Sequence, residues 1–239
     1  IASVQGVERI DHAVAISTGA LATSEEGKKW LEFNGVKVKR CKSDLIITLK
    51  LPNHASSVIV GVSTKQCNNK TPTNAQLFFT TARSFCKLLN QNGFQVSDEA
   101  IHSMKQFCGD KEFRPLDEPN LYGNRIVDPR RFFWEEINEP GRLELEKLLS
   151  EHQDEITRLL LQKAYLEDTY SPDILVHKIK KSPSWEQTEL AIYTIDEIVS
   201  LSRDYGGFWL KPYSVKKGSY KDPQGVQHMA PRFGIVQMQ

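Results

Sequence analysis

Four polar residues that could act together in catalysis flank two short apolar runs in the first third of the chain. Asp44 directly precedes the run at 45–49, and Ser63, Thr64 and Lys65 directly follow the run at 57–62. Both runs are rich in β-branched residues and a Pro-Asn-His triplet separates them, so the pattern predicts a β-hairpin. The open ends of two hairpin strands meet, so we expect Asp44 to lie beside Ser63-Thr64-Lys65.

This combination of groups favours chemistry on a phosphate. A carboxylate and a strand carbonyl, here those of Asp44 and Thr64, are hard oxygen ligands suited to Mg²⁺, which keeps most of its waters. An ammonium beside the ion, here that of Lys65, can position a water or stabilise charge on a phosphate. The pattern therefore points to metal-assisted phosphodiester hydrolysis. The alternative is that an Asp and a Lys stand at these positions only as solvated strand ends.

The same residues resemble the PD-(D/E)xK nuclease core, in which an aspartate opens one hairpin strand and a (Glu/Asp)-x-Lys triplet closes the next. Asp44 matches the first acid and Lys65 the lysine, whereas Ser63 stands where the second acid usually is. Serine occurs there in variants among type II restriction endonucleases, which recruit a glutamate from elsewhere. The resemblance implies a Mg²⁺-dependent, site-specific double-stranded DNA endonuclease that leaves 5′-phosphate ends.

The missing carboxylate is expected from a helix near the hairpin. The predicted helical stretch after Lys65, at 74–89, carries no acid. Before the hairpin, residues 11–33 are predicted to be helical, with a break at Gly19 and a second helix capped by Ser24. This second helix carries Glu25, Glu26 and Glu32, of which we favour Glu26 and keep Glu25 as the alternative.

The resemblance also implies a mechanism. Asp44, one of the two glutamates and the Thr64 carbonyl would hold one or two Mg²⁺ ions, and Lys65 would orient or activate the attacking water. The water would attack in line with the departing 3′ oxygen, while Ser63 would hydrogen-bond a metal-bound water or Glu26. A palindromic duplex target implies a homodimer in which each subunit cuts one strand.

Composition is that of an ordinary globular protein. The chain has 239 residues, of which 39% are hydrophobic and 26% charged, and its net charge of +1 neither indicates nor excludes a nucleic-acid partner. Basic clusters, such as that at 37–42, are interpreted as solvated surface. No apolar run is long enough to span a membrane. No signal peptide is visible, and the four cysteines form no CxxC pair, so we expect reduced thiols in an intracellular protein. The resemblance to restriction endonucleases implies a cytoplasmic, prokaryotic one.

We predict one nuclease domain over 1–239 with a mixed α/β (α+β), restriction-endonuclease-like fold, a mixed central sheet flanked by helices. Residues 1–108 would form the catalytic half, and 109–239 a helical segment and a β-rich C-terminal region that reads DNA. Helices are predicted at 76–89, from the Ser97 cap to Cys108, and at 142–164 with a break near His152. Pro172-Asp173 is followed by no acid-x-Lys, so it is interpreted as a turn that opens a strand; a strand at 190–194 and a helix at 195–202 follow.

The C-terminal region is predicted to be a basic, glutamine-rich loop between strands at 208–215 and 232–238. Glutamine can read adenine, and lysine or arginine can read guanine or hold phosphates. A similar strand-loop-strand precedes the terminus in several type II restriction endonucleases; the alternative is a hairpin tip without a partner. The expected DNA contacts are Gln66, Asn68, Lys211, Lys216, Lys217, Lys221, Gln224, Gln227, His228 and Arg232.

Two other functions remain open. The serine at position 63 favours a non-catalytic nucleic-acid-binding protein with a degenerate nuclease core, whereas the intact Lys65 argues against it. The second is an interaction or scaffold protein that uses the helical stretch at 142–164. A strong salt dependence of DNA binding would argue against that alternative.

Overall fold

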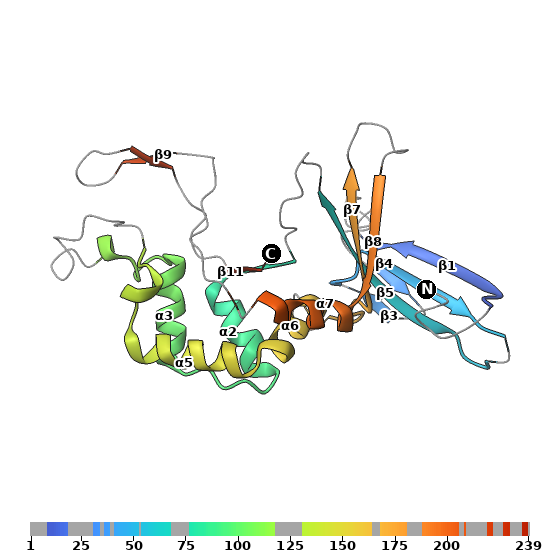
Figure 1. Ribbon diagram of the computed structural model, residues 1–239, viewed down its shortest axis with the longest axis horizontal. Coiled ribbons are helices and arrows are strands. Elements are labelled where there is room, and N and C mark those ends of the chain that lie inside the picture. The colour runs from blue at the N-terminus through green and yellow to red at the C-terminus, as the bar shows by residue number, and fades with distance from the viewer. Residues whose placement is uncertain are drawn as a thin grey trace. The chain divides into compact units, whose positions relative to one another are not determined.

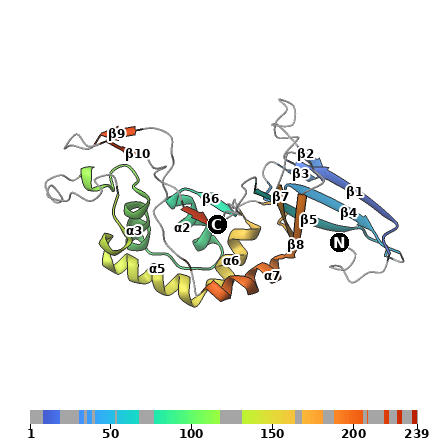
Figure 2. The same ribbon diagram turned by 45° about the horizontal axis from the view of Figure 1, so that its top comes forward.

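The computed structural model describes residues 9–18, 31–33, 36–38, 41–52, 54–67, 77–117, 131–163, 168–180, 188–205, 208, 219–221, 227–229 and 236–238. These residues form a mixed α/β structure, as predicted, with one five-stranded mixed sheet and several helices (Figures 1 and 2). The chain divides into two compact units. We call residues 1–78, 157–204 and 238–239 the sheet unit, and residues 79–156 and 205–237 the helical unit.

The sheet unit is built on strands in the order β1-β4-β5-β7-β8. Their bounds are β1 His12–Ser17, β4 Leu45–Lys50, β5 Val58–Cys67, β7 Ile174–Lys180 and β8 Thr188–Thr194. Neighbours are antiparallel except β5 and β7, which are parallel. Parallel neighbours need a long crossover, and here residues 68–173, which include most of the helices, separate the two strands in sequence. A short antiparallel pair, β2 (Leu31–Phe33) and β3 (Val36–Val38), precedes β4.

The predicted hairpin is confirmed, but its second strand is longer than predicted. Leu45 lies opposite Val62 and Leu49 opposite Val58. Beyond Val62, β5 leaves β4 and continues along β7 as far as Cys67. Because β7 satisfies the backbone of this extension, Ser63-Thr64-Lys65 lies inside a strand rather than at its end.

The helix predicted over 11–33 is wrong over residues 12–17 and 31–33, which form strands, whereas the described residue Thr18 is helical. Residues 12–17 form β1, which pairs antiparallel with β4, and residues 31–33 form β2. The run Ala13-Val14-Ala15-Ile16 is apolar throughout, and such a run has no period that separates a strand from a helix. Its β-branched residues favour a strand once β4 offers an edge to pair with. The predicted helix start at Ser24 lies outside the described residues.

Both faces of the central sheet carry buried apolar residues. On one face β4, β5 and β7 contribute a cluster that contains Leu49, Val60 and Ile174. On the other face Leu175 packs with residues of α6 (Gln153–Gln162) and α7 (Ile195–Ser202). The sheet is therefore a central layer whose helix-covered face also carries Ser63, because side chains of β5 alternate and Ser63 lies opposite Leu175. The predictions of a strand and then a short helix near 190–202 are confirmed.

The helical unit contains α2 (Ala82–Gln91), α3 (Asp98–Cys108) and α5 (Glu139–Glu151), with one-turn helices η1 (Pro115–Asp117) and η2 (Trp134–Glu136). The predicted Ser97 cap of α3 is confirmed, since its Oγ accepts a hydrogen bond from the Ala100 N–H. The predicted break near His152 is also confirmed, because this residue separates α5 from α6. The helix predicted at 76–89 begins only at Ala82, after strand β6 (Phe78–Thr80).

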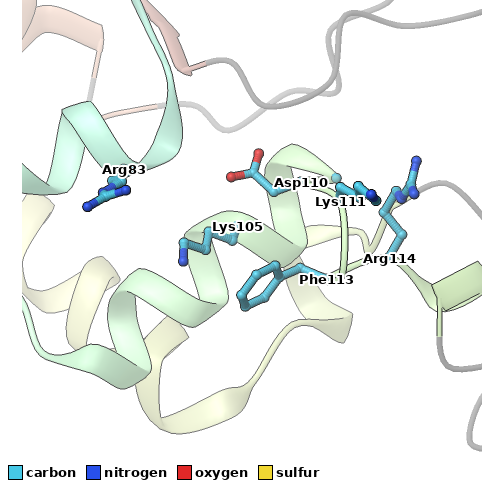
Figure 3. Close-up of a pocket in the computed structure, with 7 residues that line it drawn as sticks. Arg83, Lys105, Asp110, Lys111, Phe113 and Arg114 are labelled. Atoms are coloured by element: carbon cyan, nitrogen blue, oxygen red, sulfur yellow. The ribbon is translucent and has the colours of Figure 1, made fainter.

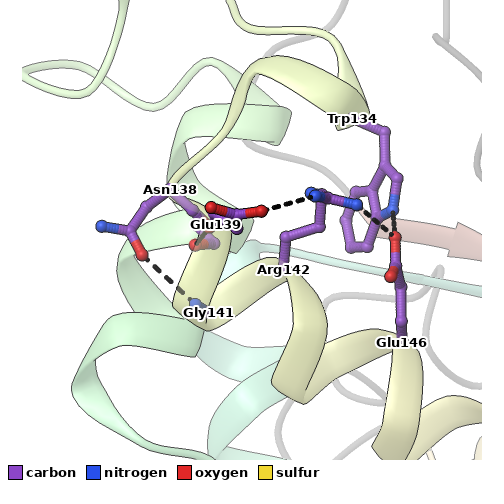
Figure 4. Close-up of polar contacts among 7 residues, drawn as sticks. Trp134, Asn138, Glu139, Gly141, Arg142 and Glu146 are labelled. Atoms are coloured by element: carbon purple, nitrogen blue, oxygen red, sulfur yellow. Dashed lines mark hydrogen bonds and ion pairs between the residues drawn. The ribbon is translucent and has the colours of Figure 1, made fainter.

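Close packing of α5 on α3 depends on Gly141. A Cβ atom at this position would lie 2.2 Å from the Glu99 carbonyl oxygen, so only glycine allows the helices to approach this closely. The start of α5 is fixed by Asn138, whose side chain accepts a hydrogen bond from the Gly141 N–H (Figure 4). Arg142 then pairs with Glu146, which also accepts from the Trp134 indole N–H and thereby ties η2 to α5.

The rest of the chain is described only in part. It contains η4 (Arg203–Tyr205), β9 (Ser219–Lys221), β10 (Gln227–Met229) and β11 (Val236–Met238), and β9 pairs antiparallel with β10. A short hairpin thus stands where an irregular basic loop was predicted. The strand predicted at 208–215 lies outside the described residues apart from Phe208. No helix in the described part of the chain is long and apolar enough to cross a bilayer.

Candidate functional site

The structure brings the Asp44 carboxylate onto Ser63 and Thr64. The Asp44 N–H donates to the Val62 carbonyl over 2.8 Å, which continues the β4–β5 ladder one residue past Leu45. Its Oδ2 atom accepts hydrogen bonds from the Thr64 N–H (2.6 Å) and the Thr64 hydroxyl (3.2 Å), and a longer one from the Ser63 hydroxyl (3.4 Å). One carboxylate oxygen is thereby fixed by the neighbouring strand. The other, Oδ1, accepts no hydrogen bond from the described residues.

Gly61 allows the chain to close around this point. A Cβ atom there would lie 2.2 Å from the Ser171 carbonyl oxygen and 2.5 Å from the Ser43 hydroxyl. The Gly61 N–H donates to the Asp173 carboxylate over 2.8 Å, and the Gly61 carbonyl accepts from the Asp173 N–H over the same distance. Asp173 thus joins the start of β7 to β5, as expected of a residue that opens a strand. The approach of these segments sets where the Asp44 carboxylate lies.

Lys65 follows in β5 on the same face as Ser63, because strand side chains alternate. Its side chain is half-buried and forms no hydrogen bond or ion pair with the described residues. It lies opposite His177 of β7, whose Nε2 atom is buried without a hydrogen-bond partner in the described structure. The amine of Lys65 is therefore available to a bound molecule.

The backbone of Thr64 offers a second oxygen beside Asp44. The N–H and C=O of one strand residue point to the same side, so the Thr64 carbonyl faces the side on which its N–H meets Asp44. Asp44 Oδ1 and this carbonyl are the hard oxygen donors that Mg²⁺ accepts, and Mg²⁺ needs few protein ligands because it retains waters. The residues present thus fit a Mg²⁺ ion with two oxygen ligands, one from Asp44 and one from Thr64.

A second lysine, Lys42, belongs to the same group, although the sequence analysis placed it on the solvated surface. Its Nζ donates to the Leu77 carbonyl over 2.7 Å and lies 5.3 Å from the centroid of the Phe78 ring. Burial, and then the charge of Lys65, lower the pKa of Lys42 to about 8, while Asp168 and Asp44 act in the opposite direction. The signal in the sequence was its position, since Lys42 precedes Asp44 by only two residues.

The described part of the chain supplies no complete metal cage. No group of three or more His, Cys, Asp or Glu residues able to hold a metal occurs among the described residues. Glu25 and Glu26, expected to supply the second carboxylate, lie outside the described residues. Asp168, just before β7, is a further acid close enough to Lys42 to influence its pKa.

Few of the expected DNA contacts can be placed. Gln66 is exposed on β5, next to Lys65. In the short hairpin, Gln227 of β10 lies opposite Lys221 of β9, and His228 lies opposite Tyr220. The remaining expected contacts, Asn68, Lys211, Lys216, Lys217, Gln224 and Arg232, lie outside the described residues.

No protein-family model matches the chain, and no curated protein matches it either.

Proposed function

We propose that the chain is a Mg²⁺-dependent endonuclease that cuts double-stranded DNA at specific sites, as a type II restriction endonuclease of the PD-(D/E)xK kind does. The observation that carries the proposal is the hydrogen bond from the Thr64 N–H to the Asp44 carboxylate. It puts the acid that opens β4 next to the residue that precedes Lys65 in β5. This is the juxtaposition that the resemblance requires of its acid and lysine.

In this proposal each residue of the site has its own role. Asp44 Oδ1 and the Thr64 carbonyl hold the ion, with Glu26 or Glu25 as the second acid. Mg²⁺ held there would supply positive charge to the phosphate diester. Hydrolysis would break the bond from phosphorus to the 3′ oxygen and so leave 5′-phosphate ends. The free ammonium of Lys65 orients the attacking water. Ser63, which is only 2% exposed, keeps the Asp44 carboxylate in place through its hydroxyl.

The charge around the site supports a polyanionic substrate. Lys65 lies close enough to Lys42 for its charge to lower the Lys42 pKa, and the described acids near Lys42 are Asp44 and Asp168. When Asp44 binds a cation, the positive charge of the two lysines exceeds the remaining negative charge of the nearby acids. A phosphate diester is a ligand whose negative charge would balance this excess. The proposed homodimer follows from the palindromic targets of the resembling enzymes.

The test is cleavage of a long, mixed-sequence duplex DNA with Mg²⁺ by the wild type and by Lys65→Ala. We expect discrete fragments from the wild type and none from the variant. A matched control is Lys50→Ala, which removes an exposed lysine at the opposite end of β4 and should cut as the wild type does. The absence of cutting by the wild type, with Mg²⁺ or Mn²⁺ and on methylated or unmethylated DNA, would contradict the proposal.

A second candidate is a nucleic-acid-binding protein with a degenerate nuclease core. The observation that favours it is the buried serine at position 63, where the resembling core usually carries an acid. DNA binding without cleavage under all of these conditions would identify this alternative. Loss of that binding in Lys65→Ala would still locate the nucleic acid at the β4–β5 ends.

A further inference from the structure

A cationic pocket lies within the helical unit and takes no part in the proposed cleavage site. Its volume is about 500 Å³, and its charged lining consists of Arg83, Lys105, Asp110, Lys111 and Arg114. Arg83 comes from α2 and Lys105 from α3, whereas the other three follow α3 in the turn that leads to η1 (Figure 3). Four basic side chains and one acid from separate segments thus meet around one hollow.

The turn that carries most of this lining is held in a defined shape. α3 ends at Gly109, which adopts the left-handed conformation with φ of 69° and donates its N–H to the last helical carbonyls. The Asp117 carboxylate then accepts from the backbone N–H groups of Glu112 (2.8 Å) and Arg114 (3.3 Å). It also accepts from two nitrogens of the Arg114 guanidinium. Lys111 and Arg114 therefore project from an ordered turn.

The positive charge of the pocket is largely uncompensated. Arg114 is paired with Asp117, but Arg83, Lys105 and Lys111 form no ion pair with any residue that the structure describes. Lys105 lies with its Nζ 4.5 Å from the centroid of the Phe113 ring, and the Asp110 carboxylate lies close enough to feel its charge without forming an ion pair. Burial raises the pKa of Asp110, although Lys105 opposes this shift, so the one acid of the pocket is poorly solvated. An anionic ligand would relieve this imbalance.

We infer that this pocket binds phosphate groups of a nucleic-acid backbone, independently of base sequence. Four of the seven residues that line the pocket are basic, and its one aromatic ring is already in contact with Lys105. Arg83 and Lys111 are exposed, as side chains that hold backbone phosphates must be. The choice of nucleic acid over other phosphates rests on the proposed function, and the pocket adds a second contact surface to it.

The test is the salt dependence of DNA binding by the full chain in EDTA, where no bond is cut. A mixed-sequence duplex oligonucleotide is titrated by fluorescence anisotropy at several NaCl concentrations with the wild type and with Arg83→Gln/Lys111→Gln. If both side chains hold phosphates, we expect weaker binding to every sequence. The slope of log Kobs against log[NaCl] should become shallower by about 2, close to 0.9 for each lost contact. Lys50→Gln/Lys147→Gln, which removes the same charge from exposed positions outside the pocket, should retain the slope.

Each outcome is decisive for one of the two ideas. An unchanged slope and affinity in the pocket variant overturns the pocket assignment, whether or not the wild type cuts DNA. Binding that is lost in the pocket variant supports the assignment even if the wild type never cuts, which would overturn only the nuclease. A second titration with ADP distinguishes a small nucleotide from a backbone. If the pocket variant loses ADP binding but still binds the duplex as the wild type does, the assignment of the pocket to a nucleic-acid backbone is overturned.

Discussion

The backbone N–H of Thr64 donates a 2.6 Å hydrogen bond to the carboxylate of Asp44, across the open end of the β4–β5 hairpin. A bond from an uncharged donor to a carboxylate is among the stronger ones in proteins. It orders the end of the hairpin and leaves the second carboxylate oxygen to a ligand. Asp44 thus has a structural role and a proposed catalytic role that substitutions can separate.

Asp44→Asn should preserve the structure and abolish cleavage. The amide can keep an oxygen toward the Thr64 N–H but lacks the negative charge that holds a cation. Asp44→Ala removes the acceptor as well, and we expect it to lower the free energy of unfolding by about 1–3 kcal/mol. Urea unfolding and DNA cleavage, measured on both variants, separate the two effects. Cleavage by Asp44→Asn at the wild-type rate would contradict the catalytic role.

Gly61→Ala should destabilise the sheet unit. The added Cβ would lie 2.2 Å from a backbone carbonyl oxygen, that of Ser171, so strand β5 or the segment before β7 must shift. Overpacking of this kind costs about 1–3 kcal/mol, and the strain falls beside Asp44. Ile59→Ala, at an exposed position two residues earlier in β5, is the control and should cost less. Equal midpoints of urea unfolding for the two variants would show that the strand accommodates the methyl group.

The features of this site that could be predicted are those determined by residues that lie close together in the sequence. The hairpin register follows from two β-branched runs and a turn, and this register places Asp44 beside Ser63. The extension of β5 could not be predicted, because it depends on β7, whose first residues are more than a hundred positions away. Lys42 was missed for a similar reason, since its burial depends on Leu77 and Phe78. Strand β1 was mistaken for a helix because only its pairing with β4 distinguishes the two.

Cys86 should resist alkylation in the folded protein. Burial raises the pKa of its thiol to about 12, so almost none of the reactive thiolate forms at neutral pH. Burial also raises the pKa of Cys108, whereas Cys41 is only partly buried. We expect iodoacetamide to modify Cys41 before Cys86 and Cys108, which should react only after unfolding in urea, as followed by mass spectrometry of peptides. Equal rates at Cys86 in the folded and unfolded states would contradict the packing of α2.

Lys42→Met should stabilise the protein most at neutral pH, and this advantage should shrink as the pH rises. The folded-state pKa of Lys42 is about 8, below its ordinary value of 10.5, so folding disfavours the protonated amine. Between these two values the unfolded chain binds a proton that the folded chain does not, and the stability of the wild type therefore rises with pH. Below the folded pKa the cost of the buried ammonium is fully present.

Urea unfolding of the wild type and of Lys42→Met at a series of pH values across this window measures the effect. The hydrogen bond to the Leu77 carbonyl is lost in the variant at every pH. The informative quantity is therefore how the difference in unfolding free energy between wild type and variant changes with pH. Lys50→Met removes an exposed lysine from β4 and should show no such trend. If the difference in unfolding free energy between wild type and Lys42→Met is the same at every pH, the charge of Lys42 is fully solvated. The amine would then lie away from Lys65, and the cationic pair invoked for the phosphate would not exist.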